Sequence, residues 1–566
     1  MRELLGVGAD TDPMTWVAQH STALDPVVRV GLQEVFSPEG VPTLDAQARS
    51  EAAVRAMLHA LREAAARTRG RPVFVAFEQV HRMDAATVRL LAGLHSRAVQ
   101  VPVFLVMTHG PRFDAPWARG EVVNLRGLDA GTVVAILQSV RSRLPVDVSL
   151  DLPRGEVMPL HLEQLIRWNL EGGGEAPKVM VDLIALRSER LPSPERRTLQ
   201  ALAVLGEATP DILGSISNVP WDEALRAELE SRGWVTVEGH AGREVVRWAH
   251  PFLREVVEAT TPAPLRSEMH RARHAQGGDD LPLEVQALHA QHGEESFQSL
   301  LLLDRVGDCA LARGDDYAGA FALRRGLEIA RRELTRGEVD DPEQAIAIFA
   351  RKLGDALVRT GELSEAEGVL REGLGVTKRG APERLRIEGV LGRVLFARGR
   401  RAEGLRIVDT AVSVAERAGA RAVAAELLEL RAELETIERA HVDAAKALEA
   451  AEVLVREGWR SAPTEAQRRH HANLLLRLAR SRRLAGVDDL QALEEARSIA
   501  ASLGHRVVVA QCEAEAAERA EMLGDRRAAM AAWRRAVANA HEAGDASLEQ
   551  EYDERLRRLG RSDAYA

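Results

Sequence analysis

The chain has 566 residues, enough for about four domains, and a net charge of −10. Cys309 and Cys512 are its only cysteines, which excludes a disulfide framework and a cysteine-based zinc site. A protein that coats nucleic acid or an anionic membrane is expected to be basic, and this chain is not. The sequence holds neither an apolar stretch of about 18 residues nor a signal peptide, so we expect a cytoplasmic protein.

The first 125 residues predict a partial α/β domain. Residues 72–77 and 101–107 are short apolar runs typical of strands, and a helix over residues 85–99 separates them. Another helix, over residues 44–69, should precede the first strand. Because parallel strands joined by a helix are normally covered on both faces, we expect this partial parallel sheet to be buried on both sides.

Two further domains are expected before residue 281. Amphipathic helices over residues 129–144 and 159–172 predict a helical lid-type domain over residues 126–187. Residues 188–280 then combine three helices with a hairpin around residues 238–242. That order is typical of a winged-helix domain.

Residues 281–560 contain an internal repeat. A small residue and a polar pair recur between two helical patterns every 38 to 47 residues, at Gly314, Gly361, Gly399, Ala440, Gly486 and Gly524. Paired helices with small residues at their crossing predict a tetratricopeptide-like α-solenoid. The fold class is therefore an α/β segment followed by a mostly α chain.

Five segments, one of them residues 124–129 (NLRGLD), resemble a known family in the same order along the chain. Residues 71–91 (RPVFVAFEQVHRMDAATVRLL) resemble the Walker B region of bacterial STAND-class signalling ATPases. Residues 103–111 (VFLVMTHGP), 159–165 (PLHLEQL) and 247–255 (RWAHPFLRE) are similar to later segments of these proteins. The resemblance implies an AAA-like nucleotide module, a winged helix and tetratricopeptide repeats. No signature of the kinase or DNA-binding effector often fused to them is found in this sequence.

The sequence lacks residues that this family needs to bind and hydrolyse a nucleotide. The phosphate-binding pattern G-x-x-x-x-G-K-[ST] is missing from the sequence. Glu78 and Gln79 stand where the family has two aspartates, and Gln79 cannot accept a proton from water. Residues 108–111 (THGP) stand where the family has a segment with a sensor-like arginine, and this arginine is missing. We therefore expect a pseudo-ATPase without catalytic residues or a cofactor. It would bind ATP and Mg²⁺ only if another chain supplied the phosphate loop.

The resemblance implies degenerate remnants of a nucleotide site, at Glu78, Gln79, His81, Asp84, Thr108, Pro159 and His250. From the residues themselves we expect His81 and Asp84 to cap and position the helix that begins at residue 85. A structural role is also expected for His250 at the end of the hairpin. His270 and His274 have a spacing that can bind metal, but we interpret them as surface histidines and expect no metal site.

Two arginine-rich segments of the solenoid are candidate partner-binding surfaces. Their proposed contact residues are Arg398, Arg400, Arg401, Arg477, Arg480, Arg482 and Arg483, with those of the helix at residues 467–483 projecting outward. The alternative is a solvated charged face. The candidate recognition helix of the winged helix, residues 221–232, has more acidic than basic residues, which argues against contact with DNA.

The sequence thus predicts a non-catalytic, STAND-like regulatory or scaffold protein. Its solenoid would bind a protein partner, such as a signalling kinase or a chain that carries a phosphate loop. Two alternatives remain: half of a split ATPase completed by another chain, and a winged-helix DNA-binding regulator. Neither a membrane nor nucleic acid is the expected partner.

Overall fold

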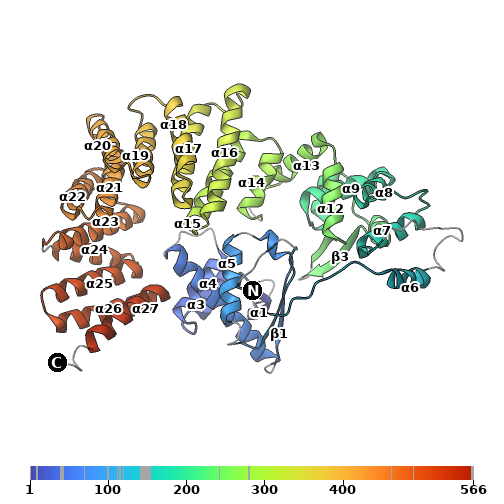
Figure 1. The fold of residues 1–566 in the computed structure, drawn as a ribbon, viewed down its shortest axis with the longest axis horizontal. Coiled ribbons are helices and arrows are strands. Elements are labelled where there is room, and N and C mark those ends of the chain that lie inside the picture. Colours follow the sequence, from blue (N-terminus) through green and yellow to red (C-terminus); the bar gives the residue numbers. More distant parts are fainter. Residues whose placement is uncertain are drawn as a thin grey trace. The chain divides into compact units, whose positions relative to one another are not determined.

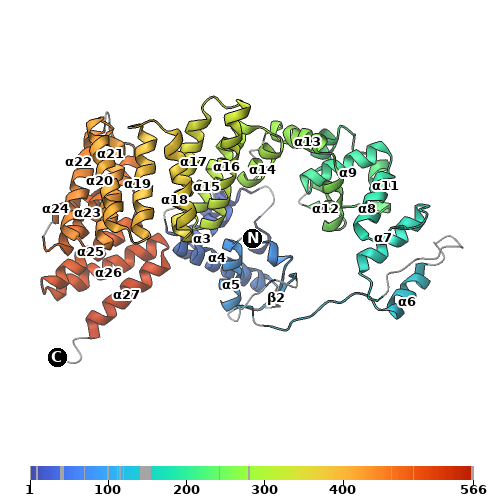
Figure 2. The ribbon, with the colours of Figure 1, turned by 45° about the horizontal axis from the view of Figure 1, so that its top comes forward.

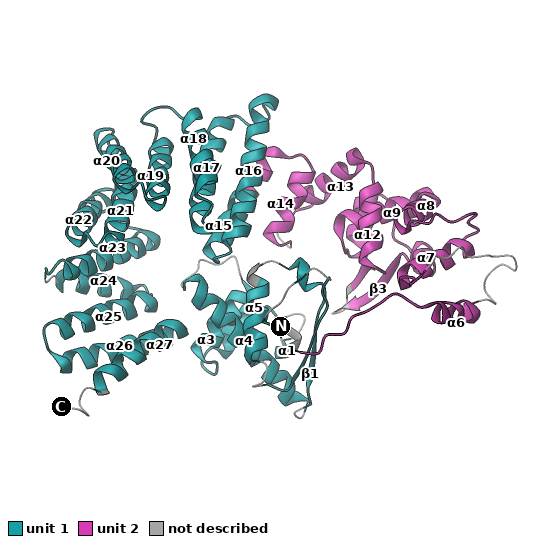
Figure 3. Cartoon of the chain, in the orientation of Figure 1, with its two compact units in different colours: residues 1–119, 303–566 teal, residues 120–302 magenta. Residues whose placement is uncertain are grey.

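A computed structural model of the chain describes residues 2–561 apart from short segments. These segments are residues 8–10, 38–43, 69–70, 84, 98–100, 111–112, 114–116, 119, 141–154, 241–242, 278–280, 460–461 and 488–489. The chain forms two compact units: unit 1 comprises Met1–Arg119 and Leu303–Ala566, and unit 2 comprises Gly120–Leu302 (Figure 3). None of the described helices has both the length and the apolar composition needed to cross a membrane.

The amino-terminal part of unit 1 is a small α/β segment. Its elements are α1 (Arg2–Leu5), α2 (Pro13–His20), α3 (Pro26–Phe36), α4 (Ala46–Arg67), β1 (Val73–Phe77), the 3₁₀ helix η1 (Val80–Arg82), α5 (Ala85–Arg97) and β2 (Val103–Met107). Helices α2, α3 and α4 each follow an aspartate whose side chain accepts a backbone N–H of the first turn: Asp12, Asp25 and Asp45. The predicted strands and the helix between them are confirmed.

The two strands form a parallel sheet that is covered on one face. β1 pairs with β2 with Phe74 opposite Phe104. Leu58 of α4 and Leu94 of α5 belong to the core on one side of the sheet. On the other side, Phe74 and Phe104 are 65% and 61% exposed, and their rings stack at 5.7 Å. The expectation that both faces are buried is therefore wrong for the part of the chain that the structure describes.

Helices α15 to α27 form the predicted solenoid of consecutive antiparallel pairs (Figures 1 and 2). They are α15 (Ser296–Ala312), α16 (Asp316–Arg336), α17 (Pro342–Thr360), α18 (Leu363–Val376), α19 (Pro382–Ala397), α20 (Arg401–Arg417), α21 (Arg421–Ile437), α22 (His441–Glu457), α23 (Glu465–Leu484), α24 (Leu490–Ser502), α25 (Arg506–Met522), α26 (Arg526–Ala543) and α27 (Ala546–Arg561). All six predicted turns lie between two of these helices, which confirms the repeat. Left-handed glycines also lie in the turns between α20 and α21, α24 and α25, and α26 and α27, at Gly419, Gly504 and Gly544.

Left-handed backbone conformations reverse the chain at these turns. Gly361, for example, has φ +83° after α17, and at the turn without glycine Arg439 takes φ +59°. Small residues let paired helices cross closely, as predicted. A Cβ atom on Gly404 of α20 would lie 2.4 Å from the carbonyl oxygen of Gly392 of α19.

The amino-terminal helices contact both the first and the last turn of the solenoid. Arg49 of α4 donates to the carbonyl oxygen of Ala312, at the end of α15, at 2.7 Å. At the other end, Val27 of α3 and Ala52 of α4 form a buried cluster with Ala546, the first residue of α27. Unit 1 therefore joins segments that lie at opposite ends of the sequence.

Unit 2 carries eleven helices and strands among its described residues before α15. They are α6 (Ala130–Val140), α7 (Pro159–Leu170), α8 (Met180–Glu189), α9 (Ser193–Leu205), α10 (Pro210–Ser217), α11 (Glu223–Ser231), β3 (Val235–His240), β4 (Arg243–Trp248), α12 (Pro251–Thr260), α13 (Ala263–Ala275) and α14 (Leu283–His292). The predicted order of three helices and an antiparallel hairpin is present. Its core includes Leu199, Leu229, Trp234 and Val246. Its assignment as a winged helix stays a prediction.

Arg187 of α8 is a fully buried cation that links three parts of unit 2. Its Nε donates to Glu171 at 3.0 Å, and one Nη donates to the carbonyl oxygen of Arg232 at 3.0 Å. The other Nη donates to Gln164 of α7. The guanidinium also lies over the ring of Trp234, 4.8 Å from its centroid.

Candidate functional site

Three of the predicted nucleotide-site remnants meet at the carboxyl ends of β1 and β2. The backbone N–H of Gln79 donates to the hydroxyl of Thr108 at 2.9 Å. The N–H of Gly110 donates to Nδ1 of His81 at 3.0 Å. Gln79 takes a left-handed conformation with φ +52°, which is uncommon for a residue with a side chain. Glu78 lies beside them and is exposed.

His81 contacts the neighbouring strand end. Its ring accepts the N–H of Gly110 after β2, and its expected role at the start of α5 stays a prediction. Asp84 lies outside the described residues. The hydroxyl of Thr108 and the His81 ring bind backbone groups of the neighbouring strand end, and Glu78 is the only carboxylate among the described remnants. This arrangement links two strand ends, and its described residues include no second carboxylate with which Glu78 could share a metal ion.

The other two remnants, Pro159 and His250, belong to unit 2. Pro159 is the first residue of α7, a position that suits its fixed φ and missing N–H. Nδ1 of the exposed His250 accepts the N–H of Phe252 at 3.1 Å and so caps α12. Both residues thus begin a helix.

Most of the candidate partner-binding arginines form ion pairs within the solenoid. The pairs are Arg398–Glu367, Arg400–Glu403, Arg401–Glu438, Arg477–Glu429, Arg482–Glu449 and Arg483–Glu515. Arg480 is exposed. Arg483 was expected to project outward, but its side chain is only 13% exposed and also pairs with Glu518. Arg400–Glu403 lies at the start of α20, and the other five pairs join different helices or the turns that follow them. The role of the arginines in partner binding stays a prediction.

The histidines at the α13–α14 junction are also placed differently than expected. His270 is buried, and its Nδ1 lies 2.9 Å from Nδ1 of His289, so its interpretation as a surface residue is wrong. Nε2 of His274 lies 3.3 Å from a carboxylate oxygen of Glu295. Within the described ranges, no group of three or more histidine, cysteine or acidic side chains is placed to hold a metal ion.

Acid is expected to destabilise the α13–α14 junction. Burial, together with the neighbouring cations and histidines, lowers the pKa of His270 to about 3 and that of His289 to about 4. The unfolded chain binds these two protons near pH 6.5, so below that pH protonation favours the unfolded state. The free energy of unfolding should fall by about 1.4 kcal/mol per pH unit for each histidine between pH 6.5 and 4. Hydrogen exchange of α13 and α14 at pH 7 and pH 5 measures this loss.

A variant with both His270 and His289 replaced by leucine should lose this pH dependence, because it lacks the two imidazoles whose pKa values are lowered. Peptides from α20, which contains no histidine, provide the internal reference in the same samples. An unchanged pH dependence in the double variant would contradict the prediction.

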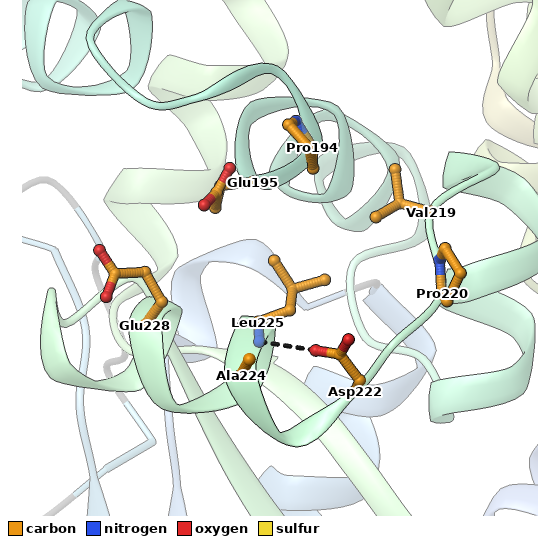
Figure 4. A pocket seen from close by; sticks show the side chains of 8 residues that line it. All are labelled: Pro194, Glu195, Val219, Pro220, Asp222, Ala224, Leu225 and Glu228. Carbon is orange, nitrogen blue, oxygen red and sulfur yellow. Dashed lines mark hydrogen bonds between the residues drawn. The ribbon is translucent and has the colours of Figure 1, made fainter.

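Unit 2 has a cavity of about 410 Å³ between α9 and α11 (Figure 4). Its lining residues are Pro194, Glu195, Val219, Pro220, Asp222, Ala224, Leu225 and Glu228. Figure 4 shows the carboxylates of Glu195 and Glu228 at one end of the cavity and the side chains of Val219 and Pro220 at the other. The cavity thus combines an acidic end with apolar walls.

The carboxylates of this cavity differ in their partners. Asp222 accepts the N–H of Leu225 at 2.8 Å and caps α11. Glu228 pairs with Arg232 at 2.6 Å. Oε2 of Glu195 is buried and has no hydrogen-bond partner among the described residues. A buried acceptor without a donor costs free energy, and this oxygen is shielded from the solvent that fills the cavity.

Sequence reasoning missed this cavity. The acidic character of residues 221–232 was recognised, but only as an argument against DNA. Glu195 lies in the first turn of α9 after Ser193 and Pro194, and this pattern is common at the start of a helix. Nothing in the sequence shows that this start lies beside Glu228, more than thirty residues later in the chain.

Comparisons with known proteins give distant similarity of structure. No family model and no curated protein matches the chain. A STAND protein with a tetratricopeptide repeat sensor from Pyrococcus horikoshii is 13% identical, with a TM-score of 0.31, over 97% of this chain and 88% of that one. The apo form of RapI is 11% identical, with a TM-score of 0.33, over 49% of this chain and 98% of RapI.

A third similar structure, a putative kinesin light chain from Podosopora anserina with nearly identical TPR-like repeats, is 15% identical. Its TM-score is 0.24, over 40% of this chain and all of that chain. Because these scores are low, the description of the solenoid depends on the helix pairs and turns of this chain itself.

Proposed function

We propose that this chain is a non-catalytic scaffold that binds a protein partner through its α15–α27 solenoid. An exposed aromatic pair supports this proposal best. Tyr317 and Phe321 lie one turn apart on α16 and are 65% and 66% exposed. Aromatic residues make up only 4% of the chain, and large exposed apolar side chains that lie together mark interaction surfaces.

Two features support the non-catalytic part of the proposal. The sequence lacks the phosphate-binding lysine loop, and Gln79 stands where a base or metal ligand would be needed. At the strand ends, Thr108 and His81 accept hydrogen bonds from backbone N–H groups. A regulatory role in a STAND-like signalling system is part of the same proposal.

Photo-crosslinking in the native host tests the proposal. A p-benzoylphenylalanine at position 321 should crosslink to one protein partner, and a Tyr317→Ala substitution in the same chain should reduce that crosslink severalfold. The same photo-reactive residue at Val453, which is 47% exposed on α22, is the control. Surface substitutions of this kind change stability by about 0.5 kcal/mol or less, so loss of folding would not explain the result. Equal crosslinking from both positions, or none from position 321, would overturn the proposal.

The bare face of the sheet favours the split-ATPase alternative. A parallel sheet normally has helices on both faces, and a two-stranded sheet is marginal alone. Phe74 and Phe104 would be covered if another chain added strands and helices here. Titration of the purified chain with Mg-ATP separates the two functions: the scaffold binds none, alone or with its crosslinked partner, whereas the split ATPase binds nucleotide once that partner is present.

The DNA-binding alternative gains no support from α11. Asp222, Glu223, Glu228 and Glu230 lie on or next to this helix, and its Arg226 pairs with Glu230 and Glu244. Phosphate groups would meet an excess of negative charge on this helix.

A further inference from the structure

We propose that residues 121–126 form a docking strand that adds, parallel to β1, to the open edge of the β1–β2 sheet in a second copy of the chain. The inference is independent of the solenoid, because neither this segment nor the sheet belongs to α15–α27. Three observations carry it: the exposed apolar side chains of the segment, its unpaired backbone, and the charges at its ends and at the ends of β1.

The segment before α6 exposes apolar side chains to solvent. Leu125, Val123 and Val122 are 89%, 73% and 71% exposed, the three highest values for a large apolar side chain among the described residues. Exposed apolar side chains that lie together mark contact surfaces. In a strand, Val123 and Leu125 would share one face and Val122 would lie on the other.

The backbone of this segment is available for pairing. Residues 121–126 form neither helix nor turn, and Figure 2 draws them as an extended trace before α6. None of their backbone groups bonds to another backbone group in the part of the chain that the structure describes. After the segment, Leu128 exchanges two backbone hydrogen bonds with Val157, at 2.7 and 3.0 Å. The segment is therefore a ready strand, of the kind that binds by adding to a sheet edge.

The sheet of unit 1 offers an edge for such a strand. It has two strands among the described residues, so β1 and β2 each have one edge without a backbone partner. A two-stranded sheet is marginal alone, and an open edge is a template for another strand. Each copy of the chain thus carries both a free strand and a free edge, and two copies can pair reciprocally.

Charge selects the edge and the direction of the added strand. Arg71 precedes β1 and Glu78 follows it, whereas Glu121 begins the segment and Arg126 ends it. All four side chains are exposed and form no ion pair with a described residue. Parallel addition beside β1 brings opposite charges together at both ends of the strand, whereas antiparallel addition would bring Glu121 beside Glu78. No charged residue directly follows β2.

One register of this pairing suits both faces of the sheet. Matching the segment one to one with residues 73–78 places Val123 and Leu125 on the face that packs against α4 and α5. The same register places Val122 beside Phe74 on the bare face. A shift by one residue would exchange the two faces, so the pattern of the segment specifies its register.

Sedimentation velocity of the full chain tests this contact. We expect a reversible monomer–dimer equilibrium in the micromolar range, because small interfaces bind weakly. Val122→Pro and Val123→Pro form a matched pair of variants. Neighbouring N–H groups point to opposite sides of a strand, so one of the two prolines removes a bond to the sheet and the other does not. One variant should weaken dimerisation by about tenfold or more, and the other by less than about threefold.

Charge reversal tests the direction of the strand. Glu78→Arg should weaken dimerisation severalfold at low salt, because it faces Arg126 of the other copy. The double variant Glu78→Arg, Arg126→Glu should restore it. In an antiparallel pairing, Glu78→Arg would instead strengthen dimerisation, because it would face Glu121.

Four results would overturn the proposal. They are no dimer at millimolar concentration, equal effects of the two proline variants, stronger dimerisation by Glu78→Arg, and slow amide exchange of residues 121–126 in the dilute monomer. The last result would show that the segment pairs within its own copy. The Tyr317→Ala variant should dimerise normally, so failure of this contact and failure of the solenoid proposal are distinguishable.

Discussion

Replacing Arg187 by alanine is expected to destabilise unit 2 by about 3–5 kcal/mol. The guanidinium is fully buried and binds Glu171, Gln164 and the carbonyl oxygen of Arg232. Its removal leaves a charged carboxylate and polar groups without their donor, and it also removes the contact with Trp234. Urea unfolding followed by hydrogen exchange of α7 and α8 measures the effect.

Arg190 offers a matched control three residues further along the chain. It lies over the ring of Trp168 at 4.3 Å from its centroid, but it is exposed. An exposed cation–π contact contributes about 0.5–1 kcal/mol, so Arg190→Ala should have a small effect. If Arg187→Ala destabilised unit 2 no more than Arg190→Ala, the Arg187 network would not hold α7 and α8 in place.

Replacing Gly31 by alanine is expected to destabilise the α3–α4 pair by about 3 kcal/mol. Gly31 is a buried helical residue of α3, and a Cβ atom there would lie 1.9 Å from the carbonyl oxygen of Ala52. Because the nearest atom belongs to the α4 backbone, no rotamer change can make room, and the two helices must separate. Hydrogen exchange of α3 and α4 peptides measures the loss.

Replacing Gly368 by alanine is expected to have the opposite effect on stability to the same replacement at Gly31. It lies in α18, is exposed, and a Cβ atom there would meet no heavy atom within 4 Å. Alanine is favoured over glycine in a helix by up to about 1 kcal/mol, so Gly368→Ala should stabilise the chain. Stabilisation by both substitutions would show that α3 and α4 do not pack as closely as described.

Local signals in the sequence predicted much of the fold. The turns at Gly361 and Gly399 were found because a left-handed residue after a helix favours glycine, which leaves a recurring mark. β1 and β2 were found because short apolar runs between helices favour strands. The exposed face with Phe74 was missed, since the same run suits a strand covered on one or both sides.

Much less of the candidate site could be predicted. Gln79 and Thr108 come together because they follow neighbouring parallel strands, which the sequence pattern did predict. The cavity beside Glu195 depends on the packing of α9 against α11, for which no local pattern exists. Likewise, the partner of Arg483 is Glu515, 32 residues away, and an arginine-rich segment alone does not show whether its charges face solvent or a neighbouring helix.

The contacts of α3 and α4 with both ends of the solenoid affect how the repeats unfold. In an open array, a terminal repeat has one neighbour, so it frays first and stability is a sum of nearest-neighbour terms. Here Ala546 of the last helix packs on Val27 and Ala52, while Arg49 of the same α3–α4 pair is bound to Ala312. Opening one end of the solenoid therefore breaks contacts with the α3–α4 pair, which also supports the other end of the solenoid. This coupling raises the cooperativity of unfolding and suppresses fraying of the terminal repeats.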